Sequence, residues 1–256
     1  MRRLTVRRQG QAVRLREDLL HHLWVEFPQH CVLLTDPQTR RFVETAIARA
    51  AHHGVTEFAA VAVYTTLMVF LGHRFDEDPL LPWASETLKK NRPLPQKQAM
   101  SRLQARAADE LAKSVGDDGE HYRRAMLWAR SKSFATLSTD YVGRGDQGLH
   151  DFVRDLLPPR YAELGAERVT ELHQRARTAA EHFGVAGPEG TLVVTALMIL
   201  LGTGFADDPF HPWTQPALKE SRDTDVPAER FHSCALRELE RHLSLDRITA
   251  AHSRRT

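Results

Sequence analysis

Cysteine is scarce in this sequence. The two residues, Cys31 and Cys234, lie far apart and form neither a CxxC pair nor a zinc-ligand spacing. This excludes a small scaffold held together by disulfides, and it predicts reduced thiols in a cytoplasmic protein.

Long apolar runs are also missing. The most apolar segments, 58–72 and 191–202, are each under about 16 residues, whereas a helix that spans a bilayer needs about 20. The basic N-terminus is not followed by the apolar core of a signal peptide. We therefore expect these segments to be core helices, and we expect no membrane partner.

An excess of charge of one sign is absent, because 35 lysines and arginines balance 33 aspartates and glutamates to a formal net charge of +2. So small a charge does not favour nonspecific nucleic-acid binding across the surface. The strongly basic cluster lies at the N-terminus without interleaved aromatic residues, and it consists of Arg2, Arg3, Arg7, Arg8, Arg14 and Arg16. We expect a flexible arm or an amphipathic first helix that meets an acidic partner, and no nucleic-acid partner.

What the sequence does contain is an internal duplication. Shifted by 130 residues, 19–90 aligns with 149–220 without a gap, with about 21 identities over about 72 positions. The clearest shared stretch reads TLMVFLGHRFDEDPLLPW in the first copy and ALMILLGTGFADDPFHPW in the second. A shorter one pairs AHHGV with EHFGV.

Each copy has the pattern of a run of helices. Apolar residues recur at helical spacing through 42–50, Gly54 is suited to end that helix, and Thr56 is suited to cap the next. The helix expected over 56–71 has almost no polar face and must be covered on several sides. Strand patterns are nearly absent, with room for one short strand around Leu4 and Val6. The predicted fold class is all-α, with two pseudo-symmetric helical repeats forming a helical bundle.

The predicted organisation has five parts. They are a basic N-terminal arm (1–18), a first helical repeat (19–90), connecting helices and a linker (91–148), a second helical repeat (149–220), and a closing helix with a frayed tail (221–256). The connecting helices are expected over 96–115 and 121–137. The three glycines of 142–148 mark the best candidate linker between the halves.

The shared corner after each apolar helix supplies the candidate site. An Asp-Pro pair forces turn geometry, and a proline then suits the first turn of a short helix that begins near a tryptophan. The main interpretation is a structural corner, in which the carboxylate bonds to nearby backbone N–H groups and the rings cover a helix end. The alternative is a binding surface, and its candidate residues are Phe75, Asp78, Trp83, Phe205, Asp208 and Trp213.

Catalytic and metal-binding patterns give little support to an enzyme. The chain lacks HExxH, GxSxG, a Walker A loop and an EF-hand loop, and GRGDQG follows no strand. His52 and its counterpart His182 lie just before a helix-ending glycine, where the helix dipole favours histidine, although a metal role stays open for the 14 histidines. We predict no catalytic residues, no metal site and no cofactor.

The motif LMVFLGHRFDEDPLLPW, together with HLWVEFPQHC and AHHGV, resembles a poorly characterised bacterial family that is often encoded near type VI secretion components. The resemblance covers 15–90 well and 149–220 less well. It implies a helical accessory, such as an adaptor or chaperone that helps to load an effector or spike component. The repeated unit departs from the single-copy pattern of that family, so a one-unit binding mode cannot simply be carried over.

The leading hypothesis is therefore a non-enzymatic protein-interaction module in the cytoplasm. The alternatives are an immunity protein that neutralises a toxin and a histidine-dependent metal-binding protein. The oligomeric state is left open.

Overall fold

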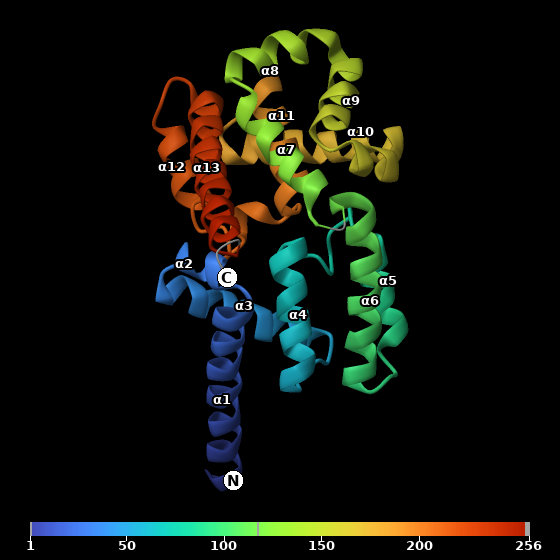
Figure 1. Ribbon diagram of the computed structural model, residues 1–256, viewed down its shortest axis with the longest axis vertical. Helices are drawn as coiled ribbons and strands as arrows, with labels where there is room; N and C mark the ends of the chain where they lie inside the picture. Colours follow the sequence, from blue (N-terminus) through green and yellow to red (C-terminus); the bar gives the residue numbers. More distant parts are fainter. Residues whose placement is uncertain (1, 117, 254–256) are drawn as a thin grey trace. The chain divides into compact units, whose positions relative to one another are not determined.

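The structure is a computed structural model that describes residues 2–116 and 118–253, with side chains described for 12–116 and 118–244. The described residues contain helices and no strand, which confirms the all-α prediction (Figure 1). The helices of the first half are α1 (Arg2–Glu26), α2 (Pro28–Val32), α3 (Asp36–His52), α4 (Phe58–Leu71), α5 (Pro82–Asn91) and α6 (Gln96–Val115). Those of the second half are α7 (Glu120–Ser131), α8 (Phe134–Asp140), η1 (Val142–Arg144), α9 (Gly145–Leu156), α10 (Pro158–Phe183), α11 (Pro188–Leu201), η2 (Phe205–Asp207), α12 (Thr214–Arg222) and α13 (Pro227–Ser253).

The chain divides into two compact units that do not follow the predicted repeat boundaries. Unit 1 comprises Met1–Ala108 together with Gly202–Pro212, and unit 2 comprises Asp109–Leu201 together with Trp213–Thr256. The corner of the second sequence copy therefore belongs to the same unit as the corner of the first copy. A pseudo-symmetric arrangement of the two copies stays a prediction.

Unit 1 packs α1, α3 and α4 against one another. Its helix α3 begins with a capping box between Thr35 and Gln38, and it ends where Gly54 adopts a left-handed φ of 76°. That glycine confirms the predicted helix stop. The fully buried large side chains of this unit are Leu19, Leu23, Phe42, Tyr64, Met68, Phe75, Leu103 and Phe205.

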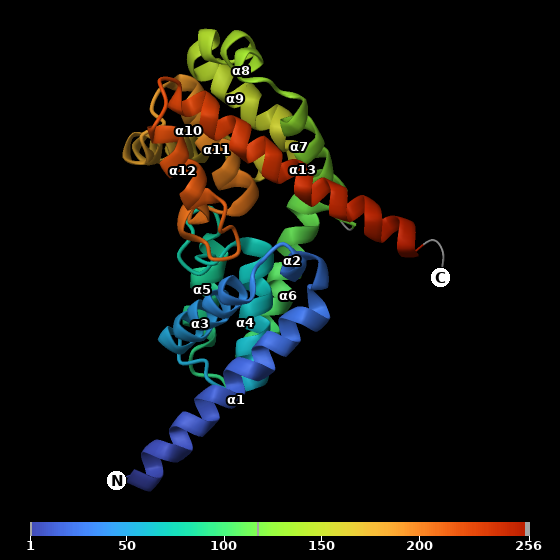
Figure 2. The ribbon, with the colours of Figure 1, turned by 90° about the vertical axis from the view of Figure 1, so that its left-hand side faces the viewer.

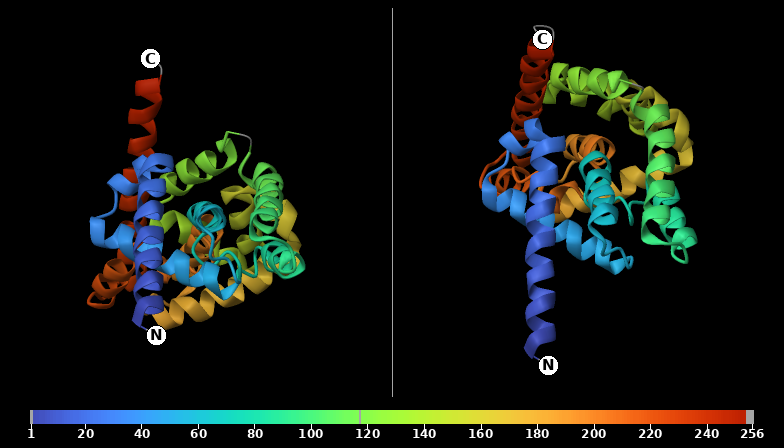
Figure 3. Two further views of the ribbon diagram at one scale, coloured as in Figure 1. Left: turned by 90° about the horizontal axis from the view of Figure 1, so that it is seen from below. Right: turned by 60° about the horizontal axis from the view of Figure 1, so that its bottom comes forward.

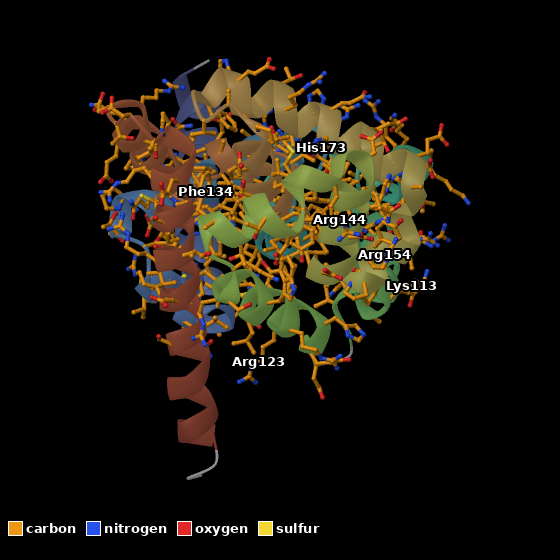
Figure 4. All side chains as sticks on the ribbon, turned by 90° about the horizontal axis from the view of Figure 1, so that it is seen from above. Lys113, Arg123, Phe134, Arg144, Arg154 and His173 are labelled. Carbon is orange, nitrogen blue, oxygen red and sulfur yellow. The ribbon has the colours of Figure 1, made fainter. Side chains whose placement is uncertain are left out.

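Unit 2 is centred on α10 and α11, which pack together and against α9 and α13. As predicted, Pro188 starts α11, at a position where its missing N–H had no helical partner. The fully buried large side chains of this unit are Phe152, Leu156, Leu172 and Phe231. On the outer side, Arg144 and Arg154 both bond to Asp151 and lie close together in Figure 4.

Three sequence expectations differ from the structure in unit 2. The expected helix over 121–137 is interrupted because Ser133 caps a new helix, α8, by accepting a bond from the Thr136 N–H. Residues 142–148 form η1 and the start of α9 rather than a loop linker. Gly148 is needed there for close packing, since a Cβ would overlap the carbonyl oxygen of Tyr141. Helix α13 extends to Ser253, so 252–253 are helical, and the rest of the expected frayed tail, 254–256, lies outside the described residues.

Two more expectations differ in unit 1. Leu4 and Val6 lie in α1 rather than in a strand. Thr56 does not cap α4, which begins at Phe58; instead, Gln96 of α6 accepts bonds from the backbone N–H groups of Thr56 and Glu57 at 2.7 and 2.9 Å. A side chain from 40 residues away thus satisfies the helix start, which a local pattern cannot reveal.

Membrane-spanning length was also examined. Within the part of the chain that the structure describes, no single helix is both long and apolar enough to cross a bilayer, and α10 with α11 passes only as a pair bent by 112°.

Candidate functional site

The two shared corners begin with the same backbone turn. Gly72 and Gly202 follow α4 and α11 directly, with φ values of 89° and 90°. Other residues rarely adopt this conformation, so glycine is required at both positions. A side chain at Gly202 would also crowd unit 1, because its Cβ would lie 3.0 Å from the carbonyl oxygen of Leu71.

The two corners bond to each other through their aspartates. Asp78 accepts a hydrogen bond from the backbone N–H of Thr203 at 2.8 Å, and Asp208 accepts one from the backbone N–H of His73 at 2.9 Å. Each carboxylate therefore reaches the residue that follows the glycine of the other copy. All four residues belong to unit 1.

Each aspartate also holds its own turn. The second carboxylate oxygen accepts a bond from the N–H two residues later, which is Leu80 for Asp78 and Phe210 for Asp208, both at 2.8 Å. Bonds to a charged acceptor are typically worth about 1.5–3 kcal/mol each, so these four fix the two turns against one another. The same residue type has the same two roles in both copies.

Asp208 stays ionised despite its burial. Burial alone would raise the pKa of this carboxyl, but the bond from His73, the nearby charges of His211 and His73, and the Phe210 N–H together lower it. His73 itself is buried, and its Nδ1 lies 3.4 Å from the Asp208 carboxylate. Arg74 donates to His73 Nε2 at 3.3 Å, which leaves the ring proton on Nδ1, facing Asp208.

A second polar cluster surrounds Asp76 at the first corner. The Asp76 carboxylate is 1% exposed; one of its oxygens bonds to Arg49, and the other lies 2.6 Å from His53 Nε2. Arg49 also pairs with Glu77 at 3.1 Å. Burial would raise the pKa of Asp76, but the bonds from His53 and Arg49 lower it to about 2. The buried hydroxyl of Tyr64 faces this charge, and burial together with Asp76 raises the pKa of Tyr64.

The sequence repeat does not include this cluster. At the positions 130 residues after Arg49, His53, Tyr64 and Asp76, the chain has Ala179, Phe183, Val194 and Ala206. Four polar or charged residues in one copy thus correspond to four apolar residues in the other. Buried ion pairs can often be replaced by apolar residues without loss of stability. The repeated corner sequence therefore does not by itself demand these charges.

The Asp76 cluster presents one group to the solvent in a fixed orientation. The His53 side chain is 23% exposed, and the buried Asp76 holds its Nε2, as a carboxylate does when it orients a functional histidine. The arrangement can therefore exchange a proton with solvent at the other ring nitrogen. Among the residues that the structure describes, no group of three His, Cys, Asp or Glu residues lies close enough to hold a metal ion.

The structure places most of the predicted site residues in the interior. Phe75, Asp78, Trp83, Phe205 and Asp208 are all buried, and all belong to unit 1. Trp213 is half-buried in unit 2, where its ring stacks on Phe231 at a centroid distance of 6.3 Å. The corner bonds match the structural interpretation of the aspartates. The binding role of these six residues stays a prediction.

Sequence reasoning missed the Asp76 cluster. His53 and Asp76 are 23 residues apart and fit no known motif, and attention to the repeated His52 drew the analysis away from His53. One signal was available: Arg49, His53, Tyr64 and Asp76 are all polar in the first copy and all apolar in the second. Such a joint change indicates residues that contact one another.

An exposed apolar surface lies near the end of α1 in unit 1. We call Trp24, Val25, Val32 and Phe70 the Phe70 surface; these side chains are 43%, 58%, 66% and 59% exposed. Phe27, at the junction of α1 and α2, contacts the Phe70 ring edge-on at a centroid distance of 5.5 Å. The α4 residue therefore lies beside the junction that carries the other three.

The site and fold together define an all-α chain whose two homologous corners are bonded to each other. No protein-family model, curated protein sequence or solved structure matches this chain.

Proposed function

We propose that this protein is an interaction module that binds another protein through the Phe70 surface of unit 1. Single exposed apolar residues are ordinary on protein surfaces, but a group of them marks a contact site. Here four large apolar side chains come from the end of α1, the end of α2 and the end of α4. The exposure of Phe70 beside Phe27 is the observation that carries the proposal.

The packing beneath this surface suits a rigid docking site. Phe27 continues a row of ring contacts into the core, through His30 at 6.2 Å and Phe210 at 5.7 Å to Phe42 at 4.7 Å. Phe210 is held in turn by its N–H bond to Asp208. The paired corners thus support the exposed ring from below, so they contribute to binding by positioning rather than by contact.

The resemblance supports a more specific role. It implies an adaptor or chaperone for a secreted effector of a type VI secretion system, and such a role requires a stable contact with a protein. A toxin would be the partner if the protein acts in immunity. Deletion of the gene would then poison the producing cell, whereas loss of an adaptor would only stop secretion.

The test is affinity capture from the native host with three forms of the full chain: wild type, Phe70→Ser and Val226→Ser. Val226 is the matched control because it is 55% exposed and lies in unit 2. We expect wild type and Val226→Ser to retain one protein in stoichiometric amount, and Phe70→Ser to lose it with an unchanged melting temperature. Retention of the partner by Phe70→Ser, or the absence of a stoichiometric partner, contradicts the proposal.

A further inference from the structure

The N-terminal half of α1 extends beyond the other helices of unit 1. Figure 2 and the right-hand view in Figure 3 show α1 continuing past α3 and α4 toward the N-terminus. Among the described side chains of 12–18, none is buried, and Val13 is 54% exposed. The buried contacts of α1 begin only at Leu19. About four turns of helix are therefore not part of the core of the unit.

Charge separates this part of the chain from the rest. Residues 1–16 contain six arginines and no aspartate or glutamate. The other 240 residues then carry 29 basic and 33 acidic side chains, a net charge of −4. The basic charge is concentrated on one helix of an otherwise slightly acidic protein, so an acidic partner is attracted to that helix and repelled elsewhere.

The isolated helix opposes its own stability. Its first turn has no acidic residue and instead begins with two arginines, which the positive end of the helix dipole disfavours. Arg3 and Arg7 stand four residues apart, a like-charge spacing that destabilises a helix further. A surface of negative charge would remove both penalties.

The apolar positions of this half indicate the shape of that surface. At about 100° per residue, Val6 and Val13 share one face of the helix, while Leu4 and Leu15 share the opposite face. Arg3, Arg7 and Arg14 share a flank between the two faces. A lipid surface matches one apolar face, and a DNA groove matches the arginines alone. A cleft that encloses the helix matches all three faces.

We propose that the N-terminal half of α1 inserts into an acidic cleft of a protein partner, whose walls contact both apolar faces. This inference rests on the proposed function and names the chemistry of the partner. Arg16 stays with its own chain, since it pairs with Glu44 of α3 at 3.3 Å. The inserted part therefore ends about where α3 begins to cover α1.

The test is photo-crosslinking in the native host with a benzoylphenylalanine placed in the full chain at Leu4, at Val6 or, as a control, at Val226. We expect Leu4 and Val6, on opposite faces, to crosslink to the same protein, and Val226 not to crosslink to it. Adducts from only one face, adducts to nucleic acid, lipid or a second copy of this chain, or no adduct at all would overturn the proposal.

A charge variant tests the arginines separately. We expect R3Q/R7Q/R14Q to reduce the crosslink yield at least tenfold, and salt at about 1 M, where screening reaches about 3 Å, to do the same. The matched control is R123Q/R124Q/R130Q on α7, whose three residues are exposed; Figure 4 shows Arg123 pointing away from the helix. Equal yields in the two triple variants would refute the role of the arginines.

The two proposals can fail separately. Loss of capture in Phe70→Ser without any crosslink from Leu4 or Val6 would leave the Phe70 surface standing and remove the inserted helix. A protein crosslink from both faces with normal capture by Phe70→Ser would do the reverse.

Discussion

Replacing Asp208 by asparagine tests the bonded corners most sharply. The change keeps the shape of the side chain but replaces one oxygen with an NH₂ group, which cannot accept the bond from either the His73 or the Phe210 N–H. One charge-assisted bond is lost, worth about 1.5–3 kcal/mol, and the other becomes a weaker neutral bond. We therefore expect Asp208→Asn to lower the free energy of unfolding of unit 1 by about 2–3 kcal/mol.

The assay is equilibrium unfolding in urea, with Asp207→Asn as the control. Asp207 is the adjacent residue, its side chain is 65% exposed, and it pairs with Arg74 only at 3.8 Å, so its loss costs less than about 1 kcal/mol. Asp78→Asn must cost about as much as Asp208→Asn, because its two bonds have nearly the same lengths. A loss below about 0.5 kcal/mol for Asp208→Asn, or a large difference between the two variants, would refute the reasoning.

Three further predictions concern single residues. Asp76 has a folded-state pKa of about 2, below its ordinary value of 3.8, so at about 1.4 kcal/mol per unit it contributes about 2 kcal/mol that is complete above pH 4 and lost as the pH falls through 2; acid titrations of stability should show this loss in wild type and not in Asp76→Asn. Trp83→Ala should cost about 3–5 kcal/mol by urea unfolding because the ring is buried, and a loss below about 1 kcal/mol would indicate that the ring is not part of the core. Gly148→Ala should lower the melting temperature by several degrees through overlap with Tyr141, while Gly143→Ala, where a Cβ meets nothing within 4 Å, should change it little.

Much of the secondary structure could be predicted from local sequence. The expected helix over 96–115 matches α6, and the expected end at Leu71 matches α4, because periodicity and glycine stops act within a few residues. The misplaced features depend on distant contacts. Gln96 caps α4 from another helix, and Gly148 serves close packing rather than flexibility.

The candidate site was predictable only in part. The repeat identified Asp78 and Asp208 as corner residues that bond to backbone N–H groups, and the structure shows such bonds. It did not reveal that each aspartate also reaches the other corner, since a repeat compares positions and does not say which copies touch. The exposure of Phe70 was equally hidden, because an apolar residue in an apolar helix is expected to be buried.

The affinity of the purified partner for Phe70→Ser, compared with wild type and Val226→Ser, tests the central claim most directly. If Phe70 is a main anchor of the contact, its loss costs about 2 kcal/mol, which corresponds to roughly a 30-fold increase in Kd, while Val226→Ser leaves Kd unchanged. A Kd for Phe70→Ser within about twofold of wild type would show that the partner binds elsewhere and would contradict the proposed function.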